Sequence, residues 1–408
     1  MPHLPFSRKT RSSVNRPLLA PRLLLACMTA AIALSFGTAA GAQSASSPAA
    51  PPAELKTHIG NLASIDYPTR MNAARMVRRA DATVAVGALR EAVAKHPDEF
   101  VRYRAFVLLS AFNDRQTGDV VRTVLRDRND RLRESAYKWL ELQPDPSMTS
   151  TLVAALQTEQ AEFVRPALVG ALAALGDNPQ VQRALVPEVT RGVDFFRGAA
   201  IDSLGRHRAA YAVDAVAGVA ALEGPLQDDA VVALGRIGGP RARAALAGLK
   251  TVPAALSATI RAAQCLAGEP CEPIIKALAE GATAPGASAT SVRAAVNGLS
   301  AIVAGGNQAA ATALVGLAGR GGGLRDEVAL SLAAAAVRNP AAVIAWLDAA
   351  SEPSRGAAID LLRTGFEDLE EDFAEEQFFA TARAFYWKAS DGSTSRNLAA
   401  SIIQKLEF

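Results

Sequence analysis

A period of 32 residues dominates the sequence. An acidic side chain recurs at this spacing, at Asp66, Asp98, Asp130, Glu162 and Asp194. An arginine follows each acid after three or four residues, at Arg70, Arg102, Arg133, Arg165 and Arg197. A strict period of this length is the signature of a stacked repeat array, in which each copy contacts mainly its neighbours. The period therefore constrains the fold more than any single residue does.

Each copy has the pattern of an amphipathic helix. Apolar residues fall at offsets −1, +3 and +7 from the arginine, as in Val101, Ala105 and Leu109. These offsets share one helical stripe, and the preceding acid can cap the first turn. Glycines near the ends of later copies, where we expect left-handed C-terminal residues, are Gly176, Gly205 and Gly235.

The register continues after the fifth copy, although the acid and the arginine are lost from most later copies. Gln227, Thr259 and Val292 stand where the arginine would be, and apolar residues keep their offsets. A second apolar segment lies between successive copies, with Pro or Gly at the joints. Two helices per period predict an all-α fold, an α-solenoid of about ten helix pairs over residues 56–365.

These features resemble the HEAT repeats, and among them the short-period HEAT-like repeats of phycobilisome lyases. The motif that carries the resemblance is apolar-Arg-x-x-Ala-x-x-x-Leu-Gly, which residues 196–205 match most fully. The resemblance covers roughly residues 60–365. It implies a superhelical stack whose second helices line a concave binding face. It implies little about activity, because such arrays serve mainly as binding surfaces in unrelated processes.

Residues 1–42 have the pattern of a secretory signal peptide. Basic residues without an acid come first, an apolar stretch runs over 23–36, and small residues end at Ala42. The apolar stretch is short for a membrane span, which needs about 20 residues. We therefore expect cleavage after Ala42 and a periplasmic or secreted protein, with an uncleaved anchor as the alternative. Residues 43–55, rich in Pro, Ala and Ser, predict a disordered linker.

Cleavage changes the charge balance. The whole chain has 43 basic and 40 acidic residues, and loss of the five basic residues in 1–42 leaves 38 basic against 40 acidic. Nucleic-acid-binding domains usually have a basic excess or stripe, which the mature chain lacks. We therefore expect no nucleic acid as a partner.

Two cysteines remain after cleavage, Cys265 and Cys271. They flank a short loop with Gly268 and Pro270 between two expected helices. An exported protein meets oxidising conditions, so we expect a disulfide that closes this loop. The alternative is a pair of free thiols.

No pattern in the sequence indicates chemistry. None of His58, His96 and His207 has metal-ligand spacing, and there is no nucleophile elbow or phosphate-binding loop. The carboxylate pair Asp228–Asp229 lies where a helix N-terminus favours negative charge. We expect no catalytic residue, no metal site and no cofactor.

The repeated acids and arginines have a structural interpretation, a ladder of bonds to carbonyls and carboxylates between neighbouring repeats. Binding residues are better sought at offsets +1, +2 and +5, which we expect to be exposed on the concave face. These are Arg75, Tyr103, Arg104, Glu134, Lys138, Asp202, Asp228 and Asp229. The row is basic first and acidic later, which suits recognition of a protein or peptide.

The composition changes in residues 366–408, which are acidic and aromatic. We expect one helix over 366–376 with Phe366, Leu369 and Phe373 on its apolar stripe. A polar terminal unit caps a repeat array, so we interpret 366–408 as a helical cap. The alternative is a docking helix for a partner.

Together these features predict a non-catalytic scaffold that binds a protein or peptide partner in the bacterial cell envelope. The alternative, implied by the resemblance, is a bilin-lyase-like enzyme or a chromophore- or cofactor-attachment factor. A third interpretation is a spacer tethered to the membrane by an uncleaved signal.

Overall fold

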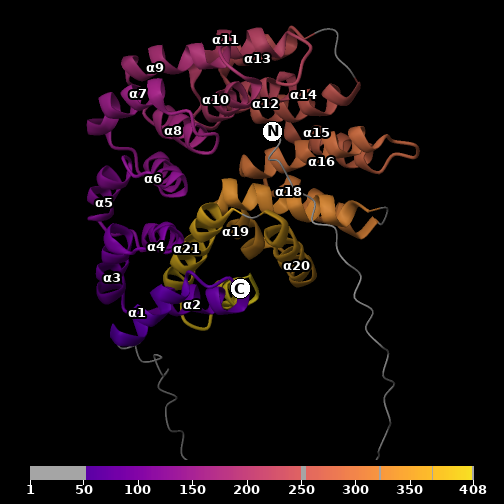
Figure 1. The fold of residues 1–408 in the computed structure, drawn as a ribbon. Helices are drawn as coiled ribbons and strands as arrows, with labels where there is room; N and C mark the ends of the chain where they lie inside the picture. Colours follow the sequence, from indigo (N-terminus) through magenta and orange to yellow (C-terminus); the bar gives the residue numbers. More distant parts are fainter. Residues whose placement is uncertain (1–51, 250–253, 321–322, 370, 407–408) are drawn as a thin grey trace, which may run out of the picture. The chain divides into compact units, whose positions relative to one another are not determined.

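The computed structural model describes residues 52–249, 254–320, 323–369 and 371–406 (Figure 1). Within these ranges the regular structure is helical throughout, without a strand. The predicted signal peptide (1–42) lies outside the described residues, as does most of the predicted linker (43–55). The end of that linker is nevertheless helical, because α1 begins at Pro52 and Leu55 packs into the core at 1% exposure. The predicted boundary of the linker is therefore wrong.

The helices succeed one another as pairs, as the period predicts. The first helices of the pairs are α1 (Pro52–Asn61), α3 (Ala82–Lys95), α5 (Thr117–Val124), α7 (Thr149–Thr158), α9 (Pro179–Leu185), α11 (Val213–Ala220), α13 (Gly239–Ala247), α15 (Cys271–Ala282), α17 (Gln308–Leu317), α19 (Pro340–Ala349) and α21 (Asp372–Lys388). The second helices are α2 (Tyr67–Arg79), α4 (Glu99–Ser110), α6 (Asp130–Leu142), α8 (Val164–Ala173), α10 (Asp194–Arg206), α12 (Gln227–Ile237), α14 (Ala254–Leu266), α16 (Ala289–Ala304), α18 (Leu324–Arg338), α20 (Glu352–Leu369) and α22 (Thr394–Leu406).

The second helices form one continuous stack. Each packs against the second helix of the pair before it and of the pair after it, from α2 to α22. Short 3-10 turns adjoin four of the first helices: η1 (Pro146–Met148), η2 (Val186–Val189), η3 (Ala210–Ala212) and η4 (Ala318–Arg320). Paired helices in which each unit contacts mainly its neighbours are consistent with the predicted all-α solenoid.

The C-terminal part of the chain differs from the prediction. Helix α20 crosses the expected boundary at 366, because Phe366 and Leu369 are buried with the other apolar residues of that helix. The single helix expected over 366–376 is divided between α20 and α21. Phe373 therefore lies on a different helix from the other two members of the predicted stripe. The pair α21–α22 continues the stack in place of a separate cap.

Glycines within the second helices allow the stacked helices to approach closely. A Cβ on Gly205 of α10 would lie 2.9 Å from the Cβ of Ala233 in α12. A Cβ on Gly235 of α12 would lie 2.6 Å from the Cα of Ala263 in α14. Neither glycine has a positive φ, and neither does Gly176 after α8. The prediction that these three glycines are left-handed helix ends is wrong. Gly205 and Gly235 are sites of close helix contact instead.

The buried apolar residues form two clusters that meet at α14. The first runs from Leu55 to Ala267, and the second from Ala262 to Leu406. Helix α21 belongs to both, because Phe373 lies in the first cluster whereas Phe378 and Phe379 lie in the second. This helix therefore joins the C-terminal repeats to the N-terminal ones.

Candidate functional site: the face that holds α21

The repeated arginines connect consecutive repeats. The Arg102 guanidinium pairs with the carboxylate of Asp127, between α5 and α6. Arg133 donates to the carbonyl oxygen of Asp127 at 2.8 Å and to the carboxylate of Glu159 at 3.1 Å. Arg165 donates to the carbonyl oxygen of Glu159 at 2.9 Å. Each of these two acids thus holds two successive arginines, one through its carboxylate and one through its backbone.

The acids of this ladder are not the ones that the 32-residue pattern singled out. Arg102, Arg133 and Arg165 pair with acids 25, 26 and 23 residues further along the chain. The third of these acids is Glu188, 2.6 Å from Arg165. A search for a second periodic acid, in phase with the ends of the first helices, could have found this series.

Two of the predicted acids pair with the arginine of their own helix, Asp130 with Arg133 at 2.8 Å and Asp194 with Arg197 at 2.7 Å. Two others serve the helix starts instead. Asp66 caps α2, and Asp98 caps α4, through bonds from backbone N–H groups. At α6 the cap is Asn129, whose side-chain oxygen accepts from the Leu132 N–H, the role expected of its neighbour Asp130. The predicted acids without a capping bond are Asp130, Glu162 and Asp194.

The arginines at the two ends of the series bind within their own repeats. Arg70 donates to the carbonyl oxygen of Ser64 at 2.8 Å. Arg197 donates to the carbonyl oxygen of Val189 at 3.2 Å and pairs with Asp194 at 2.7 Å. These bonds fix the connection between the first and second helix of a pair.

The predicted binding residues do not share one exposed face. Tyr103, Glu134 and Asp229 are buried, with exposures of 8%, 8% and 6%. Their expected exposure is wrong because the segments packed against the second helices cover these positions. Two further predicted binding residues are more accessible: Arg75 is half-buried and Asp228 is exposed.

The predicted binding residues that lie in α4 and α6 face α21. They are Tyr103, Arg104, Glu134 and Lys138. Lys138 lies 2.8 Å from the carboxylate of Glu371, just before α21, and 3.0 Å from that of Glu134. Burial alone would lower the pKa of Lys138, but Glu371 and Glu134 raise it to about 12. The ammonium group therefore stays charged and holds the two carboxylates together.

A second ion pair lies deeper in the same contact. Arg78 of α2 approaches Glu376 of α21 at 2.6 Å, and their side chains are only 9% and 2% exposed. Arg383 binds the other carboxylate oxygen of Glu376 at 2.9 Å. The Arg78 guanidinium also lies over the ring of Phe379, 5.8 Å from its centre. A buried carboxylate with two arginines is strongly destabilised when either partner is removed.

Hydrogen bonds complete the contact. The Tyr103 hydroxyl donates to Asp372 at 3.1 Å, and the Gln377 amide donates to the Ser110 hydroxyl at 2.8 Å. Burial, together with Asp372, raises the pKa of Tyr103 well above its usual value, so the hydroxyl remains a donor. Figure 1 shows α21 beside α4, although 269 residues separate Tyr103 from Asp372. We call the side chains of α2, α4 and α6 that hold α21 the acceptor face: Arg78, Tyr103, Ser110 and Lys138.

A cavity of about 80 Å³ remains between α21 and the N-terminal helices. Arg104 lines it, and its buried Nε has no hydrogen-bond acceptor. Burial lowers the pKa of Arg104, and burial with the nearby Asp372 raises that of Glu375 to about 7. The other charged residues in the lining are Arg70, Arg78, Asp372 and Glu376. The contact with α21 is therefore complementary in charge but incompletely packed.

Asp202 lies in a different cluster. Its carboxylate is 2.7 Å from Arg236, 3.1 Å from Arg206 and 3.5 Å from Arg338, which comes from α18. Burial would raise the pKa of Asp202, but these arginines hold it far below its usual range. Asp202 is therefore a permanently charged link between α10 and the C-terminal repeats.

Comparisons with known proteins find solved structures of low similarity. No family model matches the chain, and no curated protein matches it. Among solved structures, human deoxyhypusine hydroxylase with glycerol has 20% sequence identity and a TM-score of 0.28, over 62% of this chain and 96% of that one. The complex of CpcE and CpcF of phycocyanin lyase from Nostoc sp. PCC7120 has 20% identity and a TM-score of 0.34, over 63% and 97%. Importin β has 15% identity and a TM-score of 0.37, over 86% and 50%.

At these identities and TM-scores the comparisons decide nothing about this chain, and the functions of these proteins are not transferred to it. The chain's own paired helices, with their second helices stacked in sequence order, agree with the resemblance that the sequence motif carries. We therefore refer to the stack as HEAT-like.

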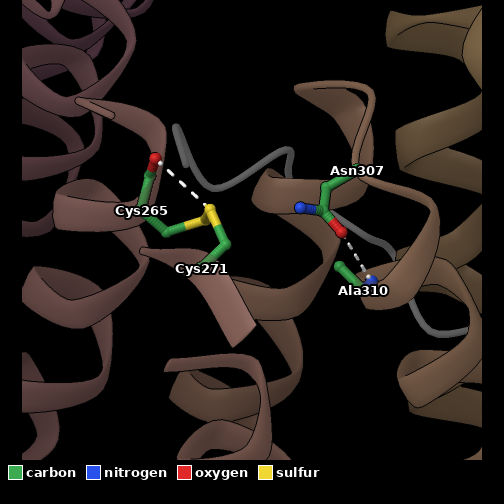
Figure 2. The surroundings of a disulfide bond; sticks show 4 residues. All are labelled: Cys265, Cys271, Asn307 and Ala310. Atoms are coloured by element: carbon green, nitrogen blue, oxygen red, sulfur yellow. Dashed lines mark hydrogen bonds between the residues drawn. A yellow bond between two sulfur atoms is a disulfide. The ribbon is translucent and has the colours of Figure 1, made fainter. Parts of the chain in front are cut away.

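The HEAT-like stack contains the disulfide that the sequence predicts. Figure 2 shows Cys265, at the end of α14, bonded to Cys271, the first residue of α15. Nearby, the Asn307 side chain caps α17 by accepting from the Ala310 N–H at 3.0 Å. The disulfide fixes the turn between two repeats at the point where the two apolar clusters meet.

The described part of the HEAT-like chain contains no group of three or more His, Cys, Asp or Glu side chains able to hold a metal ion. His207 follows α10 and places Nε2 3.0 Å from Glu141. By length and composition alone, no single described helix could cross a membrane, whereas α18 and α19, bent by 116° at their junction, meet those criteria as a pair.

Proposed function

We propose that this HEAT-like protein is an exported, non-catalytic scaffold that binds a protein or peptide partner in the bacterial cell envelope. The observation that carries the proposal is that the acceptor face already holds a helix. Side chains from three successive repeats bind it through ion pairs and hydrogen bonds. Stacked repeats present such groups at regular spacing, and complementary charge favours specific recognition.

Export is the part of the proposal that rests on the sequence. The basic and apolar pattern of residues 1–42 supports it. The disulfide between Cys265 and Cys271 suits an oxidising compartment. If the protein is exported by cleavage at the predicted site, mass spectrometry of the periplasmic form will identify Gln43 as its first residue. A form that retains residues 1–42 in the membrane fraction would contradict cleavage and favour an anchor.

Binding is tested by affinity capture from a periplasmic extract. The wild-type protein is compared with the double variant Arg104→Glu/Lys138→Glu, which reverses charge where α21 is held. The matched control is Lys95→Glu on α3, whose side chain is 77% exposed and pairs with Glu91 of its own helix.

The wild type and the control are expected to capture the same partners, and the double variant to lose them. Equal capture by all three proteins would exclude this face as the binding site. Turnover of a small molecule by the purified protein, without any captured partner, would contradict a non-catalytic scaffold.

A further inference from the structure

We propose that α21 is an internal occupant of the acceptor face, and that the partner's binding segment is an acidic amphipathic helix that displaces it. The inference rests on the proposed function and deepens it by naming the class of partner. It also gives the C-terminal acidic segment a role as an intramolecular competitor.

The acceptor face selects for acids on one side of a helix. Lys138, Tyr103 and Arg78 bind Glu371, Asp372 and Glu376, which come from two consecutive turns of the same segment. Asp372 and Glu376 are four residues apart and share a helical face, and Glu371 is the N-cap residue that precedes them. One capped helix can therefore present all three carboxylates at once. An unrelated helix with the same acidic spacing would meet the same cations and the same hydroxyl donor.

An apolar position completes the pattern. Phe379 is buried and lies within reach of the Arg78 guanidinium. Phe373 enters the apolar cluster of the N-terminal repeats. The expected partner segment is thus acidic on one edge and aromatic beside it, rather than acidic throughout.

Helix α21 can leave the acceptor face without unfolding, because its other side is held independently. The ring of Phe378 packs on Phe366 of α20 with 5.1 Å between ring centres, and Phe378 is fully buried. Contacts with α18, α19 and α22 anchor α21 among the C-terminal repeats. Displacement therefore requires the loss of one face of α21 only.

The present contact is also imperfect. Among the described residues, the buried Nε of Arg104 in α4 and the buried NH1 of Arg383 in α21 have no hydrogen-bond acceptor. Glu375 faces the cavity close to two other acids, Asp372 and Glu371. Unsatisfied buried donors and neighbouring like charges weaken an interface. A partner helix that supplies an acceptor to Arg104 would bind the acceptor face better than α21 does.

The test uses a labelled peptide with the sequence of residues 371–388 as the probe and the full mature chain as the receptor. In the loosened variant Glu371→Gln/Asp372→Asn, the ion pair with Lys138 is lost and the bond from Tyr103 loses its charged acceptor, while the acceptor face itself is unchanged. When α21 occupies the acceptor face, only the fraction of molecules with a free face can bind the probe, and the apparent affinity for the probe falls accordingly. We therefore expect the probe to bind this variant about tenfold or more tightly than the wild type. A scrambled peptide of the same composition is the control.

A charge exchange then identifies the site. Adding Lys138→Glu to the loosened variant should abolish binding of the probe, and a probe carrying Glu371→Lys should restore it. Equal binding with and without Lys138→Glu, or equal binding of the scrambled peptide, would overturn the inference.

Wild-type protein provides a measurement that does not depend on the fold of any variant. Excess probe should accelerate amide hydrogen exchange in the first turns of α21, and unchanged exchange would overturn the inference. If the probe fails in both assays while affinity capture still retrieves a partner that Arg104→Glu/Lys138→Glu loses, the inference fails and the proposed function stands. If the probe succeeds and no partner is captured, α21 is a displaceable occupant of the acceptor face and the proposed function fails.

Discussion

A single carboxyl group makes the contact between α21 and the N-terminal repeats sensitive to pH. Burial is the main cause that raises the pKa of Glu375 from 4.5 to about 7, and the nearby Asp372 adds to it. The hydrogen bond from the backbone N–H of Glu371 and the charge of Arg78, which lines the same cavity, partly offset this effect on the pKa. Since the folded protein binds this proton more tightly than the unfolded chain does, the neutral form is the one that the fold favours.

The sign of the pH dependence follows directly. The stabilisation is complete below about pH 4.5, declines as the pH rises, and is lost above about pH 7. Glu375→Gln should remove this decline and raise the free energy of unfolding at pH 8 by about 1–2 kcal/mol. Urea unfolding at pH 5 and pH 8 measures it, with the exposed Glu91→Gln as control. An unchanged difference between the two pH values would refute the role of Glu375.

The arginine ladder makes a second prediction at the level of single residues. Arg133→Ala removes bonds to Asp127 and Glu159 that join two repeats, and should cost about 3 kcal/mol in the free energy of unfolding. Arg128→Ala, at a side chain that is 87% exposed, should cost less than about 0.5 kcal/mol. Chemical unfolding of the two variants provides the comparison. Equal losses of unfolding free energy in the two variants would mean that the arginine ladder stabilises the protein no more than an exposed ion pair does.

At the scale of helices, close approach depends on glycine. Gly235→Ala would gain about 1 kcal/mol from helix propensity. The new Cβ would nevertheless lie 2.7 Å from the carbonyl oxygen of Ala263, so we expect a net loss of about 1–3 kcal/mol. Gly87→Ala in α3 meets no atom within 4 Å and should stabilise the protein. Thermal unfolding of both variants decides the matter, and a stabilised Gly235→Ala would show that α12 and α14 can separate freely.

Local pattern explains which features could be predicted from the sequence. The period and the apolar stripes predict helix pairs because each pair buries its own face against the next. Asp66 and Asp98 were predictable as caps because capping involves residues within one turn. The role of Gly205 was not, because a glycine near a helix end suits both a left-handed end and a close contact. Only the position of the next helix distinguishes these two roles.

At the scale of the whole molecule, the contact that defines the candidate site could not be predicted. Arg78 and Glu376 are 298 residues apart, and neither lies in a repeated pattern that refers to the other. The sequence did predict that residues around Tyr103 and Lys138 carry the charge of a binding face. Without tertiary information, however, it could not indicate that α21 occupies that face, because the alternative roles of 366–408 as cap or docking helix have the same composition.

Joining the two ends of the stack has an energetic consequence. The pair Lys138–Glu371 and the cluster of Asp202 with Arg338 both connect N-terminal to C-terminal repeats. Contacts between distant repeats couple units that would otherwise unfold with their neighbours only. We therefore expect one cooperative unfolding transition while α21 is held, and separate transitions once it is released.

A double-mutant cycle on Lys138 and Glu371 tests most directly whether α21 is held by the acceptor face. Lys138→Glu and Glu371→Lys should each lower the free energy of unfolding by about 1–3 kcal/mol, because each leaves like charges in contact at a partly buried site. The double variant should recover at least half of the summed loss, whereas the same exchange at the exposed pair Lys276–Glu280 should have little effect. Strictly additive losses at Lys138 and Glu371 would contradict the contact, and with it the account of α21 as the occupant of this face.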